Sequence, residues 1–74
     1  MASIALKWTG ASDMWFAHTS YGHWTIELNR RDYVITLKFN GVHEYQDMGI
    51  YSTLARAKAG VNRDHRILIK QVGA

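Results

Sequence analysis

The sequence contains no cysteine, no proline and no long apolar stretch. Without cysteine the chain can form neither a disulfide nor a thiolate-based zinc site. No segment approaches the ~20 consecutive apolar residues of a membrane-spanning helix, and the apolar run near Met1 is too short for a signal peptide. We therefore expect a soluble, cytoplasmic protein that contacts no membrane.

Acidic residues are scarce in the last third of the chain. The 74 residues include 9 Lys and Arg against 6 Asp and Glu, which gives a formal net charge of +3. From Met1 to Ser52 the two signs nearly balance, whereas beyond Ser52 the only acid is Asp64. The basic residues there are Arg56, Lys58, Arg63, Arg66 and Lys70. This asymmetry permits an anionic partner, either nucleic acid or an acidic protein surface.

Aromatic side chains are abundant instead. A chain of this length is expected to form one domain, residues 1–74, and a domain so small buries only ~60% of the surface that its unfolded chain exposes. Its core must therefore be filled by Leu, Ile, Val and the aromatic residues. These are Trp8, Trp15, Phe16, Tyr21, Trp24, Tyr33, Phe39, Tyr45 and Tyr51.

Alternation of apolar and polar residues predicts four to five antiparallel strands within residues 1–51. The expected strands cover residues 4–8, 14–19, 23–29, 33–39 and 42–45, and residues 46–49 are expected to be irregular. We expect Gly22 to adopt a positive φ in a turn, and Asn40-Gly41 to form a tight hairpin turn. One face of this sheet is apolar and needs a cover. It carries Trp24, Ile26, Leu28, Tyr33, Ile35, Leu37 and Phe39.

Residues 52–72 are the segment available to cover that face, as an amphipathic helix capped by Ser52 or Thr53. Its apolar stripe comprises Leu54, Ala57, Val61, His65, Leu68 and Val72. Gly60 offers an alternative, because glycine inside a helix costs ~1 kcal/mol and often ends one; residues 65–72 would then form a final strand. The stripe stays in phase across Gly60, which favours the helix. The predicted fold class is α+β: an antiparallel β-meander of four to five strands with one C-terminal α-helix packed on one face.

The side of this helix opposite the apolar stripe is basic. It carries Arg56, Arg63, Arg66 and Lys70. Most charged stripes are solvated helix faces, but these are usually laced by acids one turn away, and here none is present. An unbalanced stripe suits phosphates or an acidic protein patch. Arg30 and Arg31, on a predicted turn, would extend it if the sheet brings them to the same side.

Three large apolar side chains are candidate contacts for a partner or a second copy of the chain. Ile67 and Ile69 lie off the helix stripe, so they either touch the sheet rim or are exposed. If Phe16 and Trp24 point toward the helix, Trp15 faces outward unless the N-terminal segment covers it. Exposed tryptophans are frequent interface anchors. A structural homo-oligomer with these residues at its seam is therefore one hypothesis.

The four histidines predict neither a metal centre nor a catalytic site. His18 and His23 would meet across a hairpin, but a metal needs a third ligand, for which His43 or Asp13 would have to lie nearby. His65, on the apolar stripe, is expected to be a hydrogen-bonded core or boundary residue. Acid–base catalysis needs a His–carboxylate or carboxylate pair in a cleft, and adjacent residues do not face each other. We expect a binding protein with no cofactor and no enzymatic activity.

Two stretches give the chain a familiar pattern. They are His18-Thr19-Ser20-Tyr21-Gly22-His23-Trp24-Thr25-Ile26 and Gly49-Ile50-Tyr51-Ser52-Thr53-Leu54-Ala55-Arg56-Ala57-Lys58-Ala59. The pattern resembles small uncharacterised phage and prophage proteins built as a β-meander followed by a C-terminal helix. That resemblance spans residues 17–67, and Asp64-His65-Arg66-Ile67 is a shortened form of a further piece of it. It implies an accessory or counter-defence role in the host-cell cytoplasm, namely occupying a nucleic-acid-handling complex as anti-CRISPR-type inhibitors do.

A weaker likeness is to the DNA-binding domain of plant ethylene-response factors, which has three strands and a helix. The spacing of Gly22, Trp24 and Leu28 and the helix entry over residues 48–57 resemble it. That family reads DNA through Arg and Trp on the exposed face of its sheet. The corresponding residues here are Thr25, Glu27, Val34, Thr36 and Lys38. These residues do not support groove reading by the sheet. Direct DNA or RNA binding is kept as the alternative to binding a protein partner.

Overall fold

A long antiparallel hairpin forms the centre of the structure. In the computed structural model, which describes residues 6–71, β3 (Gly22–Asn29) pairs with β4 (Asp32–Phe39) along its whole length. β2 (Met14–His18) pairs with the other edge of β3, β1 (Thr9–Ala11) pairs with β2, and β5 (Gln46–Tyr51) pairs with β4. The spatial order β1-β2-β3-β4-β5 follows the chain, so the predicted antiparallel meander is confirmed.

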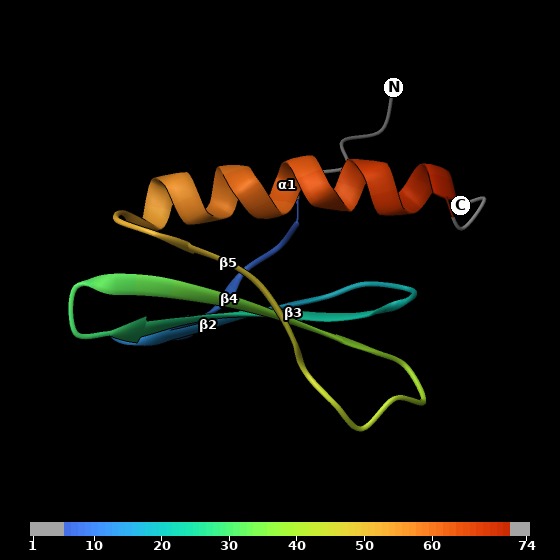
Figure 1. The fold of residues 1–74 in the computed structure, drawn as a ribbon, viewed down its shortest axis with the longest axis horizontal. Coiled ribbons are helices and arrows are strands. Elements are labelled where there is room, and N and C mark those ends of the chain that lie inside the picture. The colour runs from blue at the N-terminus through green and yellow to red at the C-terminus, as the bar shows by residue number, and fades with distance from the viewer. Residues whose placement is uncertain (1–5, 72–74) are drawn as a thin grey trace.

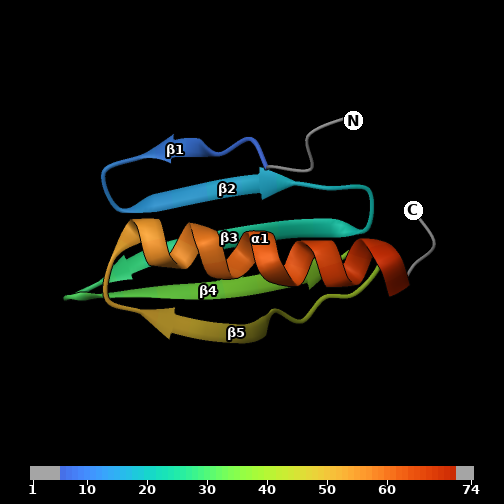
Figure 2. The ribbon, with the colours of Figure 1, turned by 90° about the horizontal axis from the view of Figure 1, so that it is seen from above.

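The helix α1 (Leu54–Gln71) follows β5 and covers one face of the sheet (Figure 1). Seen from above, α1 runs over β3 and β4, while β1 and β5 form the two edges (Figure 2). Thr53 caps the helix, because its Oγ1 accepts a hydrogen bond from the backbone N of Arg56 at 3.1 Å. The predicted α+β class, with one C-terminal helix packed on one face, is confirmed.

The core lies between α1 and the covered face of the sheet. Its fully buried members are Ala17, Trp24, Ile26, Ile35 and Leu37 from the strands and Ala57 and Val61 from the helix. The register explains why these strand residues share a face: Trp24 pairs with Ala17 on one side and with Leu37 on the other. Complete burial of one such aliphatic side chain contributes ~1.5–3 kcal/mol. Hydrophobic stabilisation is therefore concentrated in this one layer.

Gly60 does not interrupt α1. It is buried, and the helix runs through it from Leu54 to Gln71. Tyr51, the last residue of β5, lies against Gly60, and a Cβ at this position would overlap the Tyr51 hydroxyl. The ~1 kcal/mol cost of a mid-helix glycine is thus offset by close packing on β5. The alternative of a strand at residues 65–72 is wrong for residues 65–71, and Val72 lies outside the described residues.

The first strand begins later than predicted. Residues 6–8 form no strand, although Leu6 and Trp8 pack against the core, and Ile4 lies outside the described residues. β1 instead lies between the first two expected strands, 4–8 and 14–19, because Thr9 pairs with Phe16. The two-residue turn at positions 12–13 is enough to reverse the chain.

The last strand is also displaced from its predicted position. Residues 42–45 are an exposed connection, and β5 begins only at Gln46. The alternation of β5 is hidden in the sequence by a register shift, because Thr36 pairs with Asp47 whereas Ile35 pairs with Gly49. Met48 is therefore an extra residue, and such a bulge reverses the inward and outward positions along a strand.

Gly22 serves close packing of strands, not a turn. Its φ is not positive, and it is buried as the first residue of β3. A Cβ at Gly22 would overlap the carbonyl oxygen of Lys38 and lie 2.8 Å from the Cα of Phe39. The predicted positive φ at Gly22 is therefore wrong. In the Asn40-Gly41 pair, Gly41 has a positive φ of 79°, and the chain continues into the six-residue connection instead of a two-residue turn.

Candidate functional site

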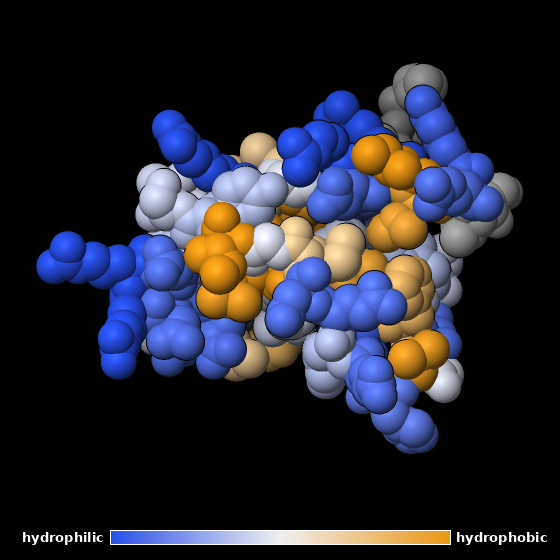
Figure 3. All heavy atoms as spheres, in the orientation of Figure 1, coloured by the Kyte–Doolittle hydropathy of each residue, from blue (hydrophilic) through white to orange (hydrophobic). Residues whose placement is uncertain are grey.

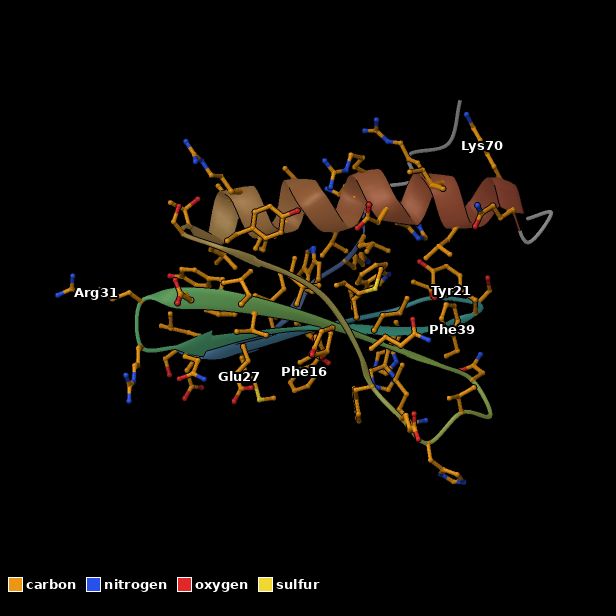
Figure 4. The ribbon with its side chains drawn as sticks, in the orientation of Figure 1. Phe16, Tyr21, Glu27, Arg31, Phe39 and Lys70 are labelled. Carbon is orange, nitrogen blue, oxygen red and sulfur yellow. The ribbon has the colours of Figure 1, made fainter. Side chains whose placement is uncertain are left out.

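The four predicted basic residues lie together on the side of α1 that faces away from the sheet. Arg56, Arg63, Arg66 and Lys70 are all exposed, and we call them the basic face. The helix residues buried against the sheet are Ala57, Gly60, Val61 and His65. Figure 4 shows Lys70 pointing away from the sheet, and hydrophilic side chains project along this side of the molecule in Figure 3. The arrangement predicted from the helical wheel is therefore present.

One acid reaches the basic face. The Nε of Arg63 lies 3.5 Å from Oδ1 of Asp64, and this is the only ion pair within residues 6–71. The Arg63 side chain remains 69% exposed, so water largely screens the attraction. The prediction that no acid accompanies the face is thus corrected at Arg63. Arg56, Arg66 and Lys70 form no ion pair with any described residue.

An open hollow of about 440 Å³ lies beside the basic face. Its lining consists of Tyr51, Arg56, Ala59, Gly60 and Arg63. The two arginines are seven residues apart, which is about two helical turns or ~10.5 Å along the axis. Ala59 and Gly60 leave the helix surface between them low, and Tyr51 forms a wall from β5. The hollow leaves no signal in the sequence, because the pairing of β5 with β4 is what brings Tyr51 to α1.

Arg30 and Arg31 do not extend the basic face along α1. They occupy the turn between β3 and β4, and Figure 4 shows Arg31 projecting outward from the end of the sheet. Arg30 lines a second hollow, of about 350 Å³, together with Asn29, Asp32, Val34 and Ile50. Its charge therefore lies close to that of an acid. Both arginines belong to the end of the molecule where α1 begins (Figure 1).

Of the three predicted apolar contacts, Ile67 is the most exposed, at 50%, and Ile69 is half-buried. The condition under which Trp15 would face outward is not met, because Trp15 pairs with Ile26 and packs against the core. Phe16 instead points away from α1 (Figure 4). Ile50 on the edge strand β5 is 66% exposed and was not singled out from the sequence. Apolar atoms on the β5 side of the molecule are visible in Figure 3.

The uncovered face of the sheet carries the expected histidine pair. His18 and His23 are opposite one another on β2 and β3, with ring centroids 5.6 Å apart, and Tyr45 meets His23 edge-on at 5.8 Å. Burial, together with the nearby His18 and Lys38, lowers the pKa of His23. Within residues 6–71 no three His, Asp or Glu residues are close enough to hold a metal ion.

A hydrogen-bonded chain joins α1 to the sheet. Trp24 Nε1 donates to the Tyr21 hydroxyl at 2.8 Å, and the same hydroxyl is hydrogen-bonded to Nδ1 of His65 at 2.7 Å. The Tyr21 oxygen accepts from Trp24, which leaves its own proton available for Nδ1 of a neutral His65 ring. Burial lowers the pKa of His65 and raises the pKa of Tyr21, so both groups favour their neutral forms. The expected hydrogen-bonded core role of His65 is confirmed.

Acidification should weaken the fold through His65. Its pKa in the folded protein lies below the ~6.5 of the unfolded chain, so the unfolded state binds the proton first. The contribution of neutral His65 to the free energy of unfolding is therefore fully present above about pH 6.5, and this contribution is lost as the pH falls below that value. We expect the urea midpoint to be lower at about pH 5 than at about pH 7.5. His23 contributes with the same sign, since its pKa is also lowered.

A double variant tests that assignment. His23→Gln combined with His65→Gln removes both groups whose pKa is lowered, and should flatten the dependence between about pH 5 and 7.5. An undiminished dependence in the double variant would assign the effect to other titratable groups.

Comparisons with models of protein families, with curated proteins and with solved structures found no match. The resemblance to phage proteins therefore stays a prediction. Within residues 6–71, no helix has enough continuous apolar sequence to cross a membrane.

Proposed function

We propose that this chain is a small, non-enzymatic binding protein that docks the basic face of α1 onto an acidic protein surface. One observation carries the proposal: Arg56, Arg63, Arg66 and Lys70 are all exposed on the side of α1 that the fold leaves free. Within residues 6–71, only Arg63 forms an ion pair, with Asp64. A row of cations with so little compensation gains most from a partner of opposite charge.

Apolar surface beside the cations favours a protein partner over nucleic acid. Ile67 is 50% exposed and lies one turn from both Arg63 and Lys70, since residues three and four apart are neighbours on a helix. Protein interfaces combine an apolar centre with a charged rim, whereas contacts to a phosphate backbone need charge alone. The basic face with Ile67 matches the first of these patterns.

The phage-type resemblance suggests where such a binding protein would act. The partner would be an acidic surface on a nucleic-acid-handling or defence complex in the host cytoplasm. Binding there would occupy a site on that complex and so inhibit it, as anti-CRISPR-type inhibitors do. This part of the proposal depends on the resemblance, whereas the basic face depends on the structure.

Charge reversal of the basic face should abolish partner binding. The test variant carries Arg56→Glu, Arg63→Glu, Arg66→Glu and Lys70→Glu. Each substitution replaces an attraction between opposite charges by a repulsion, which costs on the order of 1 kcal/mol or more. We therefore expect at least a 100-fold loss of affinity for the partner. The measurement is capture of host-lysate proteins on the immobilised chain after nuclease treatment. Circular dichroism of the variant checks that α1 is intact.

A second fourfold variant provides the matched control. Lys7→Glu, Arg30→Glu, Arg31→Glu and Lys38→Glu change the net charge equally but lie outside α1. Retained capture by this control supports a specific basic face, while equal loss in both variants would show a mere net-charge effect. If the chain binds random duplex DNA, and log affinity falls steeply with log salt concentration, the partner is nucleic acid and the proposal of a protein partner is wrong.

A further inference from the structure

We infer that the hollow lined by Tyr51, Arg56, Ala59, Gly60 and Arg63 is a peptide-binding site within the basic face. Its ligand is an extended acidic segment of the partner, with one aromatic side chain in the hollow and a carboxylate on each arginine. The inference depends on the proposed function and narrows it from an acidic surface to one recognition element.

The floor of the hollow is formed by two small residues of α1, Ala59 and Gly60, and its wall is formed by the large side chain of Tyr51. Ala59 is exposed and ends at its methyl group, and Gly60 has no side chain at all. Tyr51 fills the space next to Gly60, where a Cβ would overlap its hydroxyl. The result is a lining of aliphatic and aromatic carbon between two guanidinium groups. The hollow has a volume of about 440 Å³ and is open to solvent, so it can receive one side chain without enclosing a whole ligand.

The spacing of the two arginines fits a β-strand-like peptide. In an extended chain, side chains on one face recur every ~6.7 Å, so residues two before and two after a central residue are ~13 Å apart. The helix positions of Arg56 and Arg63 are ~10.5 Å apart, a separation that two long side chains easily adjust. A central aromatic residue would then enter the hollow while flanking Glu residues meet the arginines, in charge-assisted hydrogen bonds.

The charges around the hollow select against other ligands. Within residues 6–71 no acid lines it, and Arg56 has no ion pair to break before binding. A nucleoside monophosphate carries its negative charge at one end, whereas the acidic peptide brings a separate carboxylate to each arginine. The acidic peptide uses both cations and the floor together.

Three synthetic peptides test the site in a titration of the ¹⁵N-labelled chain. They are acetyl-Glu-Ser-Phe-Ser-Glu-amide and two controls in which either the Phe is replaced by Ala or both Glu are replaced by Gln. The first peptide should shift the amide signals of Tyr51, Ala59 and Gly60. The Ala peptide should bind about tenfold more weakly or worse, because burial of an aromatic side chain is lost. Equal binding of the first two peptides, tighter binding of adenosine monophosphate, or no shift at these amides at millimolar peptide overturns the inference.

Two variants that replace an alanine of α1 with leucine separate this inference from the proposed function. Ala59→Leu fills the hollow, whereas Ala55→Leu makes the same change on an exposed helix residue outside it. We expect Ala59→Leu to lose peptide binding at least tenfold and Ala55→Leu to retain it. If Ala59→Leu still binds the peptide and the partner while charge reversal abolishes both, the hollow is not the site but the basic face still is. If charge reversal also leaves partner binding intact, the proposed function itself fails.

Discussion

Replacing Gly22 with alanine is expected to lower the free energy of unfolding by about 3 kcal/mol or more. The added Cβ would overlap the Lys38 carbonyl oxygen and approach the Phe39 Cα to 2.8 Å. Both atoms belong to the backbone of β4, so no side-chain rotation can relieve the contact. The two central strands would have to separate where they begin to pair. Urea unfolding monitored by tryptophan fluorescence measures the loss.

Gly41→Ala is the matched control for this prediction. Gly41 has a positive φ of 79° but no heavy atom within 4 Å of an added Cβ. Its substitution carries only the backbone cost of placing alanine in the left-handed region, on the order of 1 kcal/mol. If Gly41→Ala were as damaging as Gly22→Ala, strand contact would not be the reason that position 22 needs glycine.

Tyr21→Phe is expected to be nearly as damaging, with a loss of roughly 2–4 kcal/mol. The hydroxyl is the only link between Trp24 Nε1 and His65 Nδ1, at 2.8 and 2.7 Å. Trp24 is 0% exposed and His65 7%, so neither nitrogen can turn to bulk water when the hydroxyl is removed. A buried donor or acceptor without a partner costs ~1–3 kcal/mol. For a domain of this size the melting temperature should fall by roughly 10–25 °C.

The same chemical change at Tyr45 isolates the role of the hydroxyl. Tyr45 is 56% exposed in the connection before β5, so Tyr45→Phe should shift the melting temperature by only a few degrees at most. A similarly small shift for Tyr21→Phe would mean that Trp24 and His65 find other partners, and that the chain of hydrogen bonds does not hold α1 on the sheet.

Local patterns were sufficient for most of the sheet and for the helix. The prediction for strands 23–29 and 33–39 agrees with the structure almost to the residue, because Trp24, Ile26, Ile35 and Leu37 recur at every second position and all belong to one covered face. The helical stripe was equally plain. β5 was misplaced because its bulge at Met48 breaks the alternation on which such predictions depend.

The candidate site divides in the same way. The basic face could be predicted because spacing along one helix decides which residues share a side. The hollow could not, because Tyr51 reaches Gly60 only through the pairing of β5 with β4. The sequence leaves the side of Trp15 open, since both Trp15 and Phe16 are large and apolar and the alternation alone does not say which one is covered.

The sequence by itself determined the α+β class, the order of the elements and the charge of the outer side of α1. Each of these depends on residues close together in the chain. Only the tertiary structure decided that α1 continues through Gly60, that Tyr21 links Trp24 to His65, and that a hollow separates Arg56 from Arg63. Each of those depends on contacts between residues distant in sequence, where the packing of one side chain fixes the room left for another.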